Sequence, residues 1–262
     1  MRKALAVALL ASAAFVLAVG PAGAITFGQP DGNRHPWVGA LVAEFDQPGQ
    51  KDVLCSGTLI APTVFLTASH CTAFLSSIGI APDQVWVTFD TDFDQQSPLI
   101  PGTYHTNPLF GHDQADPHDI AVVTLDSAPA VAPATLPTAG LLDQLKAAGS
   151  LRDQRFTAVG YGTVKNDKTG GSSNFFFDGV RRYVDQSYSA LTDSWLKLSM
   201  NPSTGDGGTC YGDSGGPHFL GDTKLVVALT VTGDTVCRAT DVDYRLDTPS
   251  ARSFLAPFVT LP

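Results

Sequence analysis

Short runs of apolar, β-branched and aromatic residues recur along the chain, and clusters of Gly, Pro and Asp separate them. The clearest runs are residues 38–44, 64–68, 85–89, 120–125, 156–162, 195–200 and 225–231. Runs of this length between turn residues are typical of β-strands. Many short strands joined by turns predict an all-β sandwich or barrel.

Helix signals are fewer. Residues 141–149 end at a glycine, and residues 248–258 begin with Thr248 at the cap position and Pro249 in the first turn. The stretch 127–140 contains three prolines and no charged residue, which indicates a connector. The pattern therefore predicts two β-rich halves, residues 25–135 and 136–262, with a helix at the C-terminus.

The first 24 residues read as a separate segment. Arg2 and Lys3 precede an apolar run from Ala4 to Val19, and the small residues Ala22-Gly23-Ala24 follow. This order is typical of a secretory signal peptide. The run is shorter than the roughly 20 residues that a membrane-spanning helix needs. We therefore expect a secreted, extracellular chain that begins at Ile25 and does not associate with membranes once the signal is removed.

The chain is acidic, with a formal net charge of -9 at pH 7. An acidic surface repels nucleic acid and anionic lipid, so neither is expected as a partner. The simplest role of this charge is to keep the protein soluble, and a monomer is expected.

Four cysteines, Cys55, Cys71, Cys210 and Cys237, predict two disulfides in an exported chain. Three connectivities are open, and the pairs close in sequence are Cys55 with Cys71 and Cys210 with Cys237. No C-x-x-C spacing occurs, which disfavours a metal site.

Asp90, Asp92 and Asp94 alternate as in a calcium-binding loop. Gln95 and Pro101 stand where such a loop has Gly and Glu, which favours a solvated loop. We expect neither a metal nor a cofactor.

The segment CYGDSGGP, residues 210–217, has the composition of a strained turn around Ser214. A serine hydroxyl becomes a good nucleophile only when a neighbouring base takes its proton. His70 is the best candidate base, because it follows an apolar run directly and precedes Cys71. Asp119 opens another apolar run, where it could orient the imidazole. Gly212 beside Ser214 allows the backbone to turn N–H groups toward a developing oxyanion.

The sequence resembles the chymotrypsin-like (trypsin-like) serine proteases, as a secreted member of the bacterial type. The resemblance rests on SGTLI before TASHC, on DIAVV and on GDSGGP, in the order His, Asp, Ser. It extends to both cysteine pairs, to AVGYG and to the C-terminal helix, and so covers nearly all of the chain after residue 24. It implies an all-β fold of two six-stranded antiparallel β-barrels with the active site between them, together one peptidase domain.

The same resemblance implies a role for each candidate residue. His70 would be the general base, Asp119 its orienting carboxylate, and Ser214 the nucleophile that forms an acyl-enzyme. The N–H groups of Gly212 and Ser214 would form the oxyanion hole. Asp213 would pair with the terminal ammonium of Ile25, which the predicted signal cleavage would create.

The two cysteine pairs would lie beside this site. Cys55–Cys71 would hold the turn that carries His70, and Cys210–Cys237 the walls of the specificity pocket. The chain also departs from the usual family pattern. Thr26 and Phe27 follow Ile25 in place of Val-Gly, and Ser69 replaces Ala. Thr230-Val231-Thr232 replaces the Ser-Trp-Gly strand beside the substrate, which puts the pairing with substrate in question.

The resemblance also places the specificity pocket, which we assign to Gly208, Thr209, Thr232 and Val242. Gly208 offers no charge where trypsin-like members carry Asp, and branched residues at 232 and 242 would narrow the pocket. These features favour small or medium apolar side chains at the cleaved residue. The alternative is that Asp206 or Asp241 enters the pocket and favours basic residues.

The expected function is a secreted serine endopeptidase that acts on protein or peptide substrates. Two alternatives stay open: a catalytically silent homologue that binds a partner through the same cleft, and an esterase that uses the same triad. A proteinaceous inhibitor also stays open as a further partner.

Overall fold

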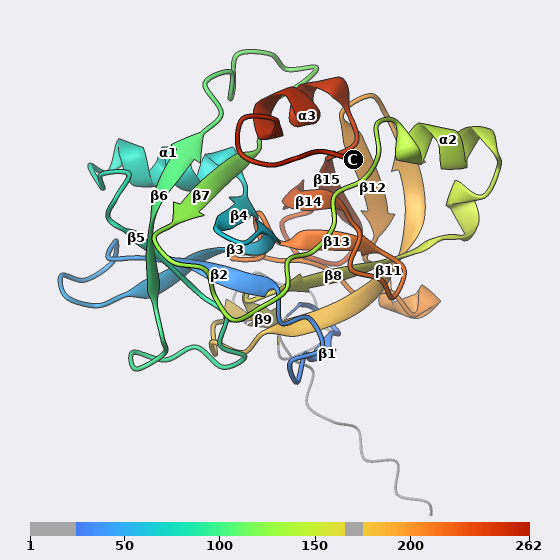
Figure 1. The fold of residues 1–262 in the computed structure, drawn as a ribbon. Helices are drawn as coiled ribbons and strands as arrows, with labels where there is room; N and C mark the ends of the chain where they lie inside the picture. Colours follow the sequence, from blue (N-terminus) through green and yellow to red (C-terminus); the bar gives the residue numbers. More distant parts are fainter. Residues whose placement is uncertain (1–24, 166–174) are drawn as a thin grey trace, which may run out of the picture.

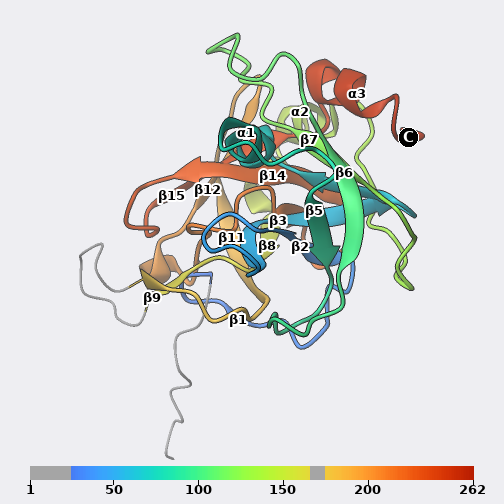
Figure 2. The ribbon, with the colours of Figure 1, turned by 90° about the vertical axis from the view of Figure 1, so that its left-hand side faces the viewer.

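Two closed six-stranded antiparallel barrels lie side by side and confirm the expected fold (Figures 1 and 2). The computed structural model describes residues 25–165 and 175–262. The predicted signal peptide lies outside the described residues. No helix in the described part is long and apolar enough to cross a membrane.

The first barrel is built from the N-terminal half of the chain. Its strands are β2 (Val38–Ala43), β3 (Asp52–Ala61), β4 (Val64–Thr67), β5 (Val85–Thr88), β6 (Ile100–Thr106) and β7 (Ala121–Leu125). They pair in the order β2-β3-β4-β7-β6-β5 and close on themselves. A closed barrel leaves no free sheet edge, which suits a chain of short strands.

The second barrel is built from the C-terminal half. Its strands are β8 (Arg155–Gly160), β11 (Arg182–Leu191), β12 (Trp195–Ser199), β13 (Pro217–Leu220), β14 (Val226–Gly233) and β15 (Thr240–Arg245). Their order is β11-β12-β15-β14-β13-β8, and pairing of β8 with β11 closes the barrel. β1 (Gln29–Pro30) pairs with β11, while β9 (Val164–Lys165) and β10 (Phe175–Phe176) form a separate pair.

Three α-helices accompany the barrels: α1 (Ser69–Ser77), α2 (Leu141–Ala147) and α3 (Pro249–Leu255). Short 3-10 turns lie at Leu151–Asp153 and Pro202–Thr204. The sequence predicts α2 and α3 but not α1. In α3 the Thr248 hydroxyl accepts a hydrogen bond from the backbone N–H of Ala251 at 3.2 Å, as its cap position predicts.

The seven predicted strands all occur, but five strands of the two barrels were missed, namely β3, β6, β11, β13 and β15. These contain polar residues or glycine within the run. In β15, for example, Asp241 and Asp243 are fully buried although a carboxylate ordinarily marks an exposed position.

The main apolar core continues from one barrel into the other. Leu41 and Phe65 of the first barrel and Phe219 and Leu229 of the second belong to one connected cluster of buried side chains. Leu255 of α3 joins the same cluster. The two halves therefore pack as one body, which fixes the surfaces that meet between them.

Arg181, just before β11, is fully buried where the N-terminal segment and both barrels meet. Its guanidinium donates to Asp31 Oδ2 at 3.0 Å and to the carbonyls of Val38 at 2.7 Å and Phe89 at 3.1 Å. Burial alone raises the pKa of Asp31, but the hydrogen bond from His35 and the charge of Arg181 outweigh it and hold that pKa below its usual value. The carboxylate is therefore ionised and paired in the folded chain.

Ser56 of β3 forms the second polar link across the seam. Its hydroxyl donates to the Gly212 carbonyl at 3.0 Å and accepts from the Tyr161 backbone N–H at 2.9 Å. Its own N–H donates to the Ser214 carbonyl at 2.9 Å, and its carbonyl accepts from the Thr67 hydroxyl at 2.9 Å. One small buried side chain thus ties the first barrel to the turn around Ser214.

Replacing Arg181 by Met keeps the apolar stem but leaves Asp31 buried without its cation. Breaking such a buried pair costs about 3–5 kcal/mol, so Arg181→Met should lower the free energy of unfolding in urea by that amount. Arg34→Met is the matched control, because Arg34 is exposed over the Tyr183 ring, and it should cost less than about 1 kcal/mol. Equal losses in the two variants would show that Arg181 does not hold the seam.

Candidate active site

His70 lies in the first turn of α1, immediately after β4. Ser69 fixes the start of this helix: its hydroxyl donates to the Ile120 carbonyl at 2.7 Å and accepts from the Asn107 N–H at 3.0 Å. The disulfide between Cys55 and Cys71 ties the same turn to β3, as predicted. The serine that replaces Ala at position 69 therefore has a structural role. Its hydroxyl connects the turn that carries His70 to Ile120, the residue that follows Asp119.

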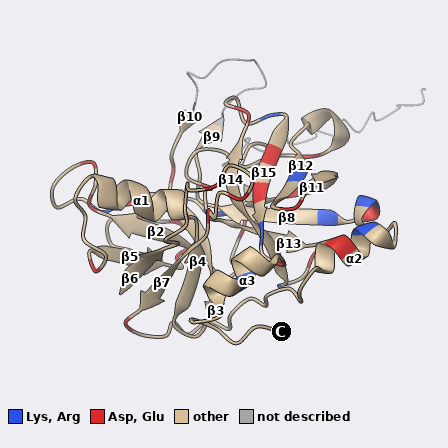
Figure 3. Ribbon diagram, turned by 90° about the horizontal axis from the view of Figure 1, so that it is seen from above, with Lys and Arg blue, Asp and Glu red and all other residues tan. Residues whose placement is uncertain are grey.

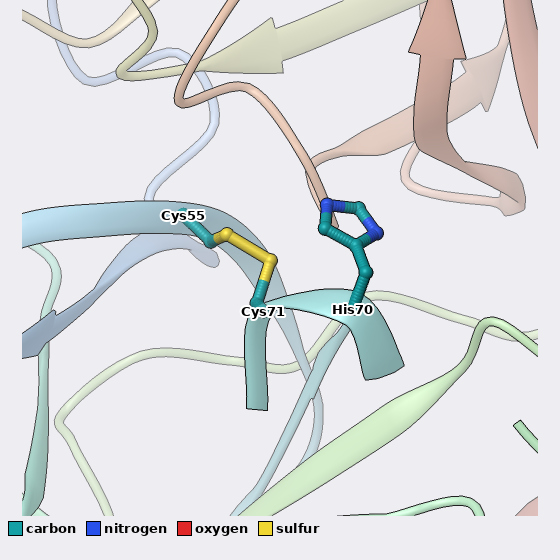
Figure 4. Close-up of side chains that lie close together, drawn as sticks. All are labelled: Cys55, His70 and Cys71. Atoms are coloured by element: carbon teal, nitrogen blue, oxygen red, sulfur yellow. A yellow bond between two sulfur atoms is a disulfide. The ribbon is translucent and has the colours of Figure 1, made fainter. Parts of the chain in front are cut away.

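Asp119 holds both the ring and the backbone of His70. Asp119 Oδ2 lies 2.8 Å from His70 Nδ1, and Oδ1 accepts the His70 backbone N–H at 2.8 Å. The carboxylate is buried, whereas the imidazole is partly exposed. Figure 4 shows the ring extending from the start of α1 beside the Cys55–Cys71 disulfide. The arrangement leaves Nε2 available to act as a base.

The Ser214 turn packs directly against the segment that precedes His70. Gly215 has φ of +76°, and a Cβ at this position would lie 2.3 Å from Thr67 Oγ1 and 2.7 Å from the Ala68 N. Only glycine tolerates both this backbone conformation and this close approach. The structure thus brings the Ser214 turn to the end of β4, where α1 and His70 begin.

In the described part of the chain, no hydrogen bond joins the His70 imidazole to the Ser214 hydroxyl. Such contacts are often long in free enzymes and shorten when substrate binds. The His70–Asp119 pair is therefore formed in advance, and the contact with Ser214 is the part of the expected triad that the structure leaves open.

Two backbone N–H groups flank Asp213 without an acceptor among the described residues. They belong to Gly212 and Ser214, the expected oxyanion hole. Gly212 adopts φ of +97°, and its carbonyl is held by the Ser56 hydroxyl. The peptide groups of the turn are thus fixed while both N–H groups are free to bind an anion.

Asp213 itself points into the interior. Its carboxylate accepts the N–H groups of Cys210 and Gly162, each at 2.8 Å, and no ion pair reaches it from the described residues. Burial raises the pKa of this carboxyl to about 7, although the two hydrogen bonds oppose the shift. Its negative charge is therefore poorly compensated by the described residues.

Ile25 is fully buried, and the next residue is bound close to the same turn. Thr26 N donates to the Gly208 carbonyl at 2.7 Å, and Gly208 N donates back at 3.0 Å. The structure thus attaches the start of the expected mature chain to the segment that leads into Cys210. No hydrogen bond or ion pair joins Ile25 to Asp213 among the described residues.

A cavity of about 180 Å³ opens beside Ser214, and its walls include Thr209 and Thr232. Two other residues expected in the pocket, Gly208 and Val242, do not line it. A Cβ on Gly208 would lie 1.9 Å from Met200 Sδ, so the Met200 side chain occupies the space that a larger residue at 208 would need. The predicted disulfide Cys210–Cys237 forms part of the cavity wall.

The two acids considered for the pocket are both turned away from it. Asp206 is bonded to Arg155, Ser187 and Thr204. Asp241 is fully buried behind Thr209, whose hydroxyl donates to it at 2.7 Å. Neither carboxylate lines the cavity directly.

Two groups of three potential metal ligands occur among the described residues. In the first, Cys55 and Cys71 are bonded to each other and therefore cannot act as thiolate ligands next to His70. The second consists of His218, Asp241 and Asp243 in the interior of the second barrel.

Sequence reasoning missed the role of Ser56, although the residue opens the SGTLI motif. No local pattern marks a serine that bonds to a turn more than 150 residues away.

The comparisons with known proteins agree with this geometry. The family model named Trypsin matches residues 26–253. A solved structure described as HL collagenase superposes with a TM-score of 0.63 at 17% sequence identity, over 90% of this chain and 96% of that one. The superposition shows the fold, and the family match extends over most of the sequence. The chain therefore belongs to the trypsin family of serine proteases.

Proposed function

We propose that the protein is a secreted serine endopeptidase that hydrolyses peptide bonds through an acyl-enzyme. The observation that carries the proposal is the packing of the Ser214 turn against the segment that leads into the His70–Asp119 pair, with two N–H groups of that turn lacking an acceptor among the described residues. An imidazole oriented by a buried carboxylate is the arrangement that activates a serine hydroxyl.

In the first half of the reaction, Ser214 Oγ attacks the substrate carbonyl while His70 Nε2 takes the hydroxyl proton. The N–H groups of Gly212 and Ser214 then bind the oxygen of the tetrahedral intermediate. His70 returns the proton to the leaving amine, and the acyl group stays on Ser214. A water molecule releases it by the same steps in reverse.

Maturation would follow from the predicted cut after residue 24. The new ammonium of Ile25 would pair with Asp213 and hold the oxyanion turn in place. Two observations support this step: Ile25 is already buried, and the Asp213 carboxylate has no ion-pair partner among the described residues. On this proposal the exported chain is active without a further propeptide.

Replacing the proposed nucleophile should abolish turnover. Ser214→Ala should lower kcat by about 10⁴-fold or more, because the remaining groups cannot form the acyl-enzyme. The measurement is digestion of casein and of a peptide library, with fluorophosphonate labelling of the unmodified protein in parallel. Labelling without peptide cleavage would indicate the esterase, and absence of labelling would indicate the silent binding protein.

Ser56 should affect kcat more than KM. Ser56→Ala removes the donor to the Gly212 carbonyl, which loosens the oxyanion turn and should lower kcat about tenfold with KM nearly unchanged. Ser56→Thr keeps the hydroxyl and should retain most of the rate. If both variants lost stability and activity to the same extent, Ser56 would be only a packing residue.

Asp213 should make the stability of the uncut chain fall as the pH rises. Its pKa of about 7 lies above the usual 3.8, so the folded state binds the proton more tightly. The associated stability is complete below about pH 4 and is lost as the pH rises through about 7.

Urea unfolding at pH 5 and pH 8 measures this effect, in a chain that keeps the signal segment and carries Ser214→Ala to prevent self-cleavage. Asp213→Asn in the same background should remove the Asp213 contribution. The mature chain should not show this decline between pH 5 and pH 7, because the Ile25 ammonium compensates the carboxylate. A decline that persisted unchanged in Asp213→Asn would contradict the assignment.

A further inference from the structure

Hydroxyl groups line much of the cavity beside Ser214. Four threonines line it, Thr209, Thr230, Thr232 and Thr235. No Lys, Arg or His is among the described residues of its wall, and Asp234 contributes the one acidic side chain. The Asp234 carboxylate is occupied by backbone N–H groups of residues 238–240.

Thr209 connects this wall to a fully buried carboxylate. Its hydroxyl donates to Asp241 Oδ1 at 2.7 Å. A hydroxyl has one proton and two lone pairs, so the Thr209 oxygen can only accept a further hydrogen bond. A substrate group that reaches this oxygen must therefore bring its own proton.

Asp241 is held in this role by the interior of the second barrel. Gln186 Nε2 donates to Asp241 Oδ2 at 2.8 Å, and His218 Nε2 lies 3.3 Å from the same oxygen. Burial alone raises the pKa of Asp241, but the His218, Gln186 and Thr209 contacts outweigh it and keep that pKa below its usual value. Asp241 is therefore ionised and accepts the hydrogen bond from the Thr209 hydroxyl as a strong acceptor.

The other acid of the cluster does not compete for that proton. Asp243 Oδ1 lies 3.3 Å from His218 Nδ1, and neither atom has a hydrogen-bond partner among the described residues. Burial, followed by the nearby Asp241 carboxylate, raises the pKa of Asp243 well above its usual value. Asp243 therefore holds its proton more tightly than an ordinary carboxyl group does. Both acids lie on β15, where Figure 3 shows a red stretch inside the molecule.

We propose that Asp241, acting through Thr209, makes this cavity select side chains that end in N–H donors, namely an amide or an ammonium group. The inference rests on the proposed endopeptidase function and names the substrate class of the same site. The carboxylate has no exposed surface, so it does not meet the substrate directly. Thr209 links it to the cavity through a hydroxyl whose proton is engaged in the hydrogen bond to Asp241, so that only its lone pairs face the substrate.

This assignment differs from the apolar preference that Gly208 and the branched wall residues suggested. Position 208 is closed by Met200 and contributes nothing to the cavity. A carboxylate-bearing side chain would face the Thr209 lone pairs with Asp241 behind them, and would be rejected. An apolar side chain would remove water from the Thr209 oxygen without supplying a donor to its lone pairs.

Four peptides that differ only at the cleaved residue test the proposal with the mature, unmodified protein. Gln, Met and Glu have similar size and differ in donor, apolar and anionic character, and Lys adds a cationic donor. We expect kcat/KM for Gln and Lys to exceed that for Met by about tenfold or more, and that for Glu by about a hundredfold. Equal or faster cleavage after Met or Glu would overturn the proposal.

Two variants locate the effect. Thr209→Val keeps the shape and removes the hydroxyl, so the Gln-to-Met and Lys-to-Met ratios should fall to near one. Thr209→Ser restores the hydroxyl and should restore both ratios. Asp206→Asn is the matched control for a buried acid of the same half that does not line the cavity, and it should leave both ratios unchanged. Ratios that survive in Thr209→Val would also overturn the proposal.

Each cleavage rate is divided by the concentration of protein that a fluorophosphonate labels. This normalisation separates a failure of the proposed endopeptidase function from a failure of the proposed substrate class. If the unmodified protein neither labels nor cleaves any peptide, the proposed function is wrong, and the substrate class falls with it. If it labels and cleaves but shows no preference for Gln and Lys over Met, the substrate class alone is wrong. The peptide comparison needs no variant, so poor folding of Thr209→Val would not weaken it.

Discussion

The active site depends on how closely the Ser214 turn can approach the first barrel. Gly215 lies against Thr67 and Ala68 with no room for a side chain, and Ser56 bonds to the turn from the adjacent strand. His70 lies two residues after Ala68. The contact that joins the barrels therefore also sets the position of the imidazole relative to the Ser214 turn. The proposed catalytic groups, which come from distant parts of the chain, are thus positioned by the packing of the seam. A side chain at position 215 would press on Thr67 of β4 and on the Ser56 carbonyl of β3 and so push the turn away from the first barrel.

Much of this could be predicted from the sequence, and what could not has a physical reason. The seven apolar runs gave strands, and TASHC, DIAVV and GDSGGP gave the members of the candidate site, because both depend on local patterns. Strand β15 was missed because its buried positions carry Asp241 and Asp243, and the partners of Asp241, Gln186 and Thr209, lie in other parts of the chain. The role of Ser56 and the closure of position 208 by Met200 also depend on contacts between segments far apart in the sequence. Such contacts leave no periodic signal.

Two buried carboxylates lie beneath the site and have different surroundings. Asp213 has backbone N–H groups and no nearby cation in an ion pair within the described chain, and its pKa rises to about 7, with Asp241 among the causes. Asp241 has Gln186, His218 and Thr209, and its pKa stays low. The protonation of Asp213 is therefore sensitive to a positive charge placed beside it. Asp241, in contrast, stays ionised and acts as a hydrogen-bond acceptor throughout. Burial raises the pKa of both carboxyl groups, and only at Asp241 do the contacts with His218, Gln186 and Thr209 outweigh it.

The packing of Met200 against Gly208 also limits how this pocket can change in evolution. An acidic residue at 208 cannot be gained by one substitution, since its Cβ would overlap the Met200 sulfur. Met200 would first have to become smaller, and that step by itself opens a void in the barrel with no benefit to substrate binding. A larger residue at position 208 therefore requires a smaller side chain at position 200, so the effects of substitutions at the two positions depend on each other. Changes in preference are more accessible through the threonines of the wall.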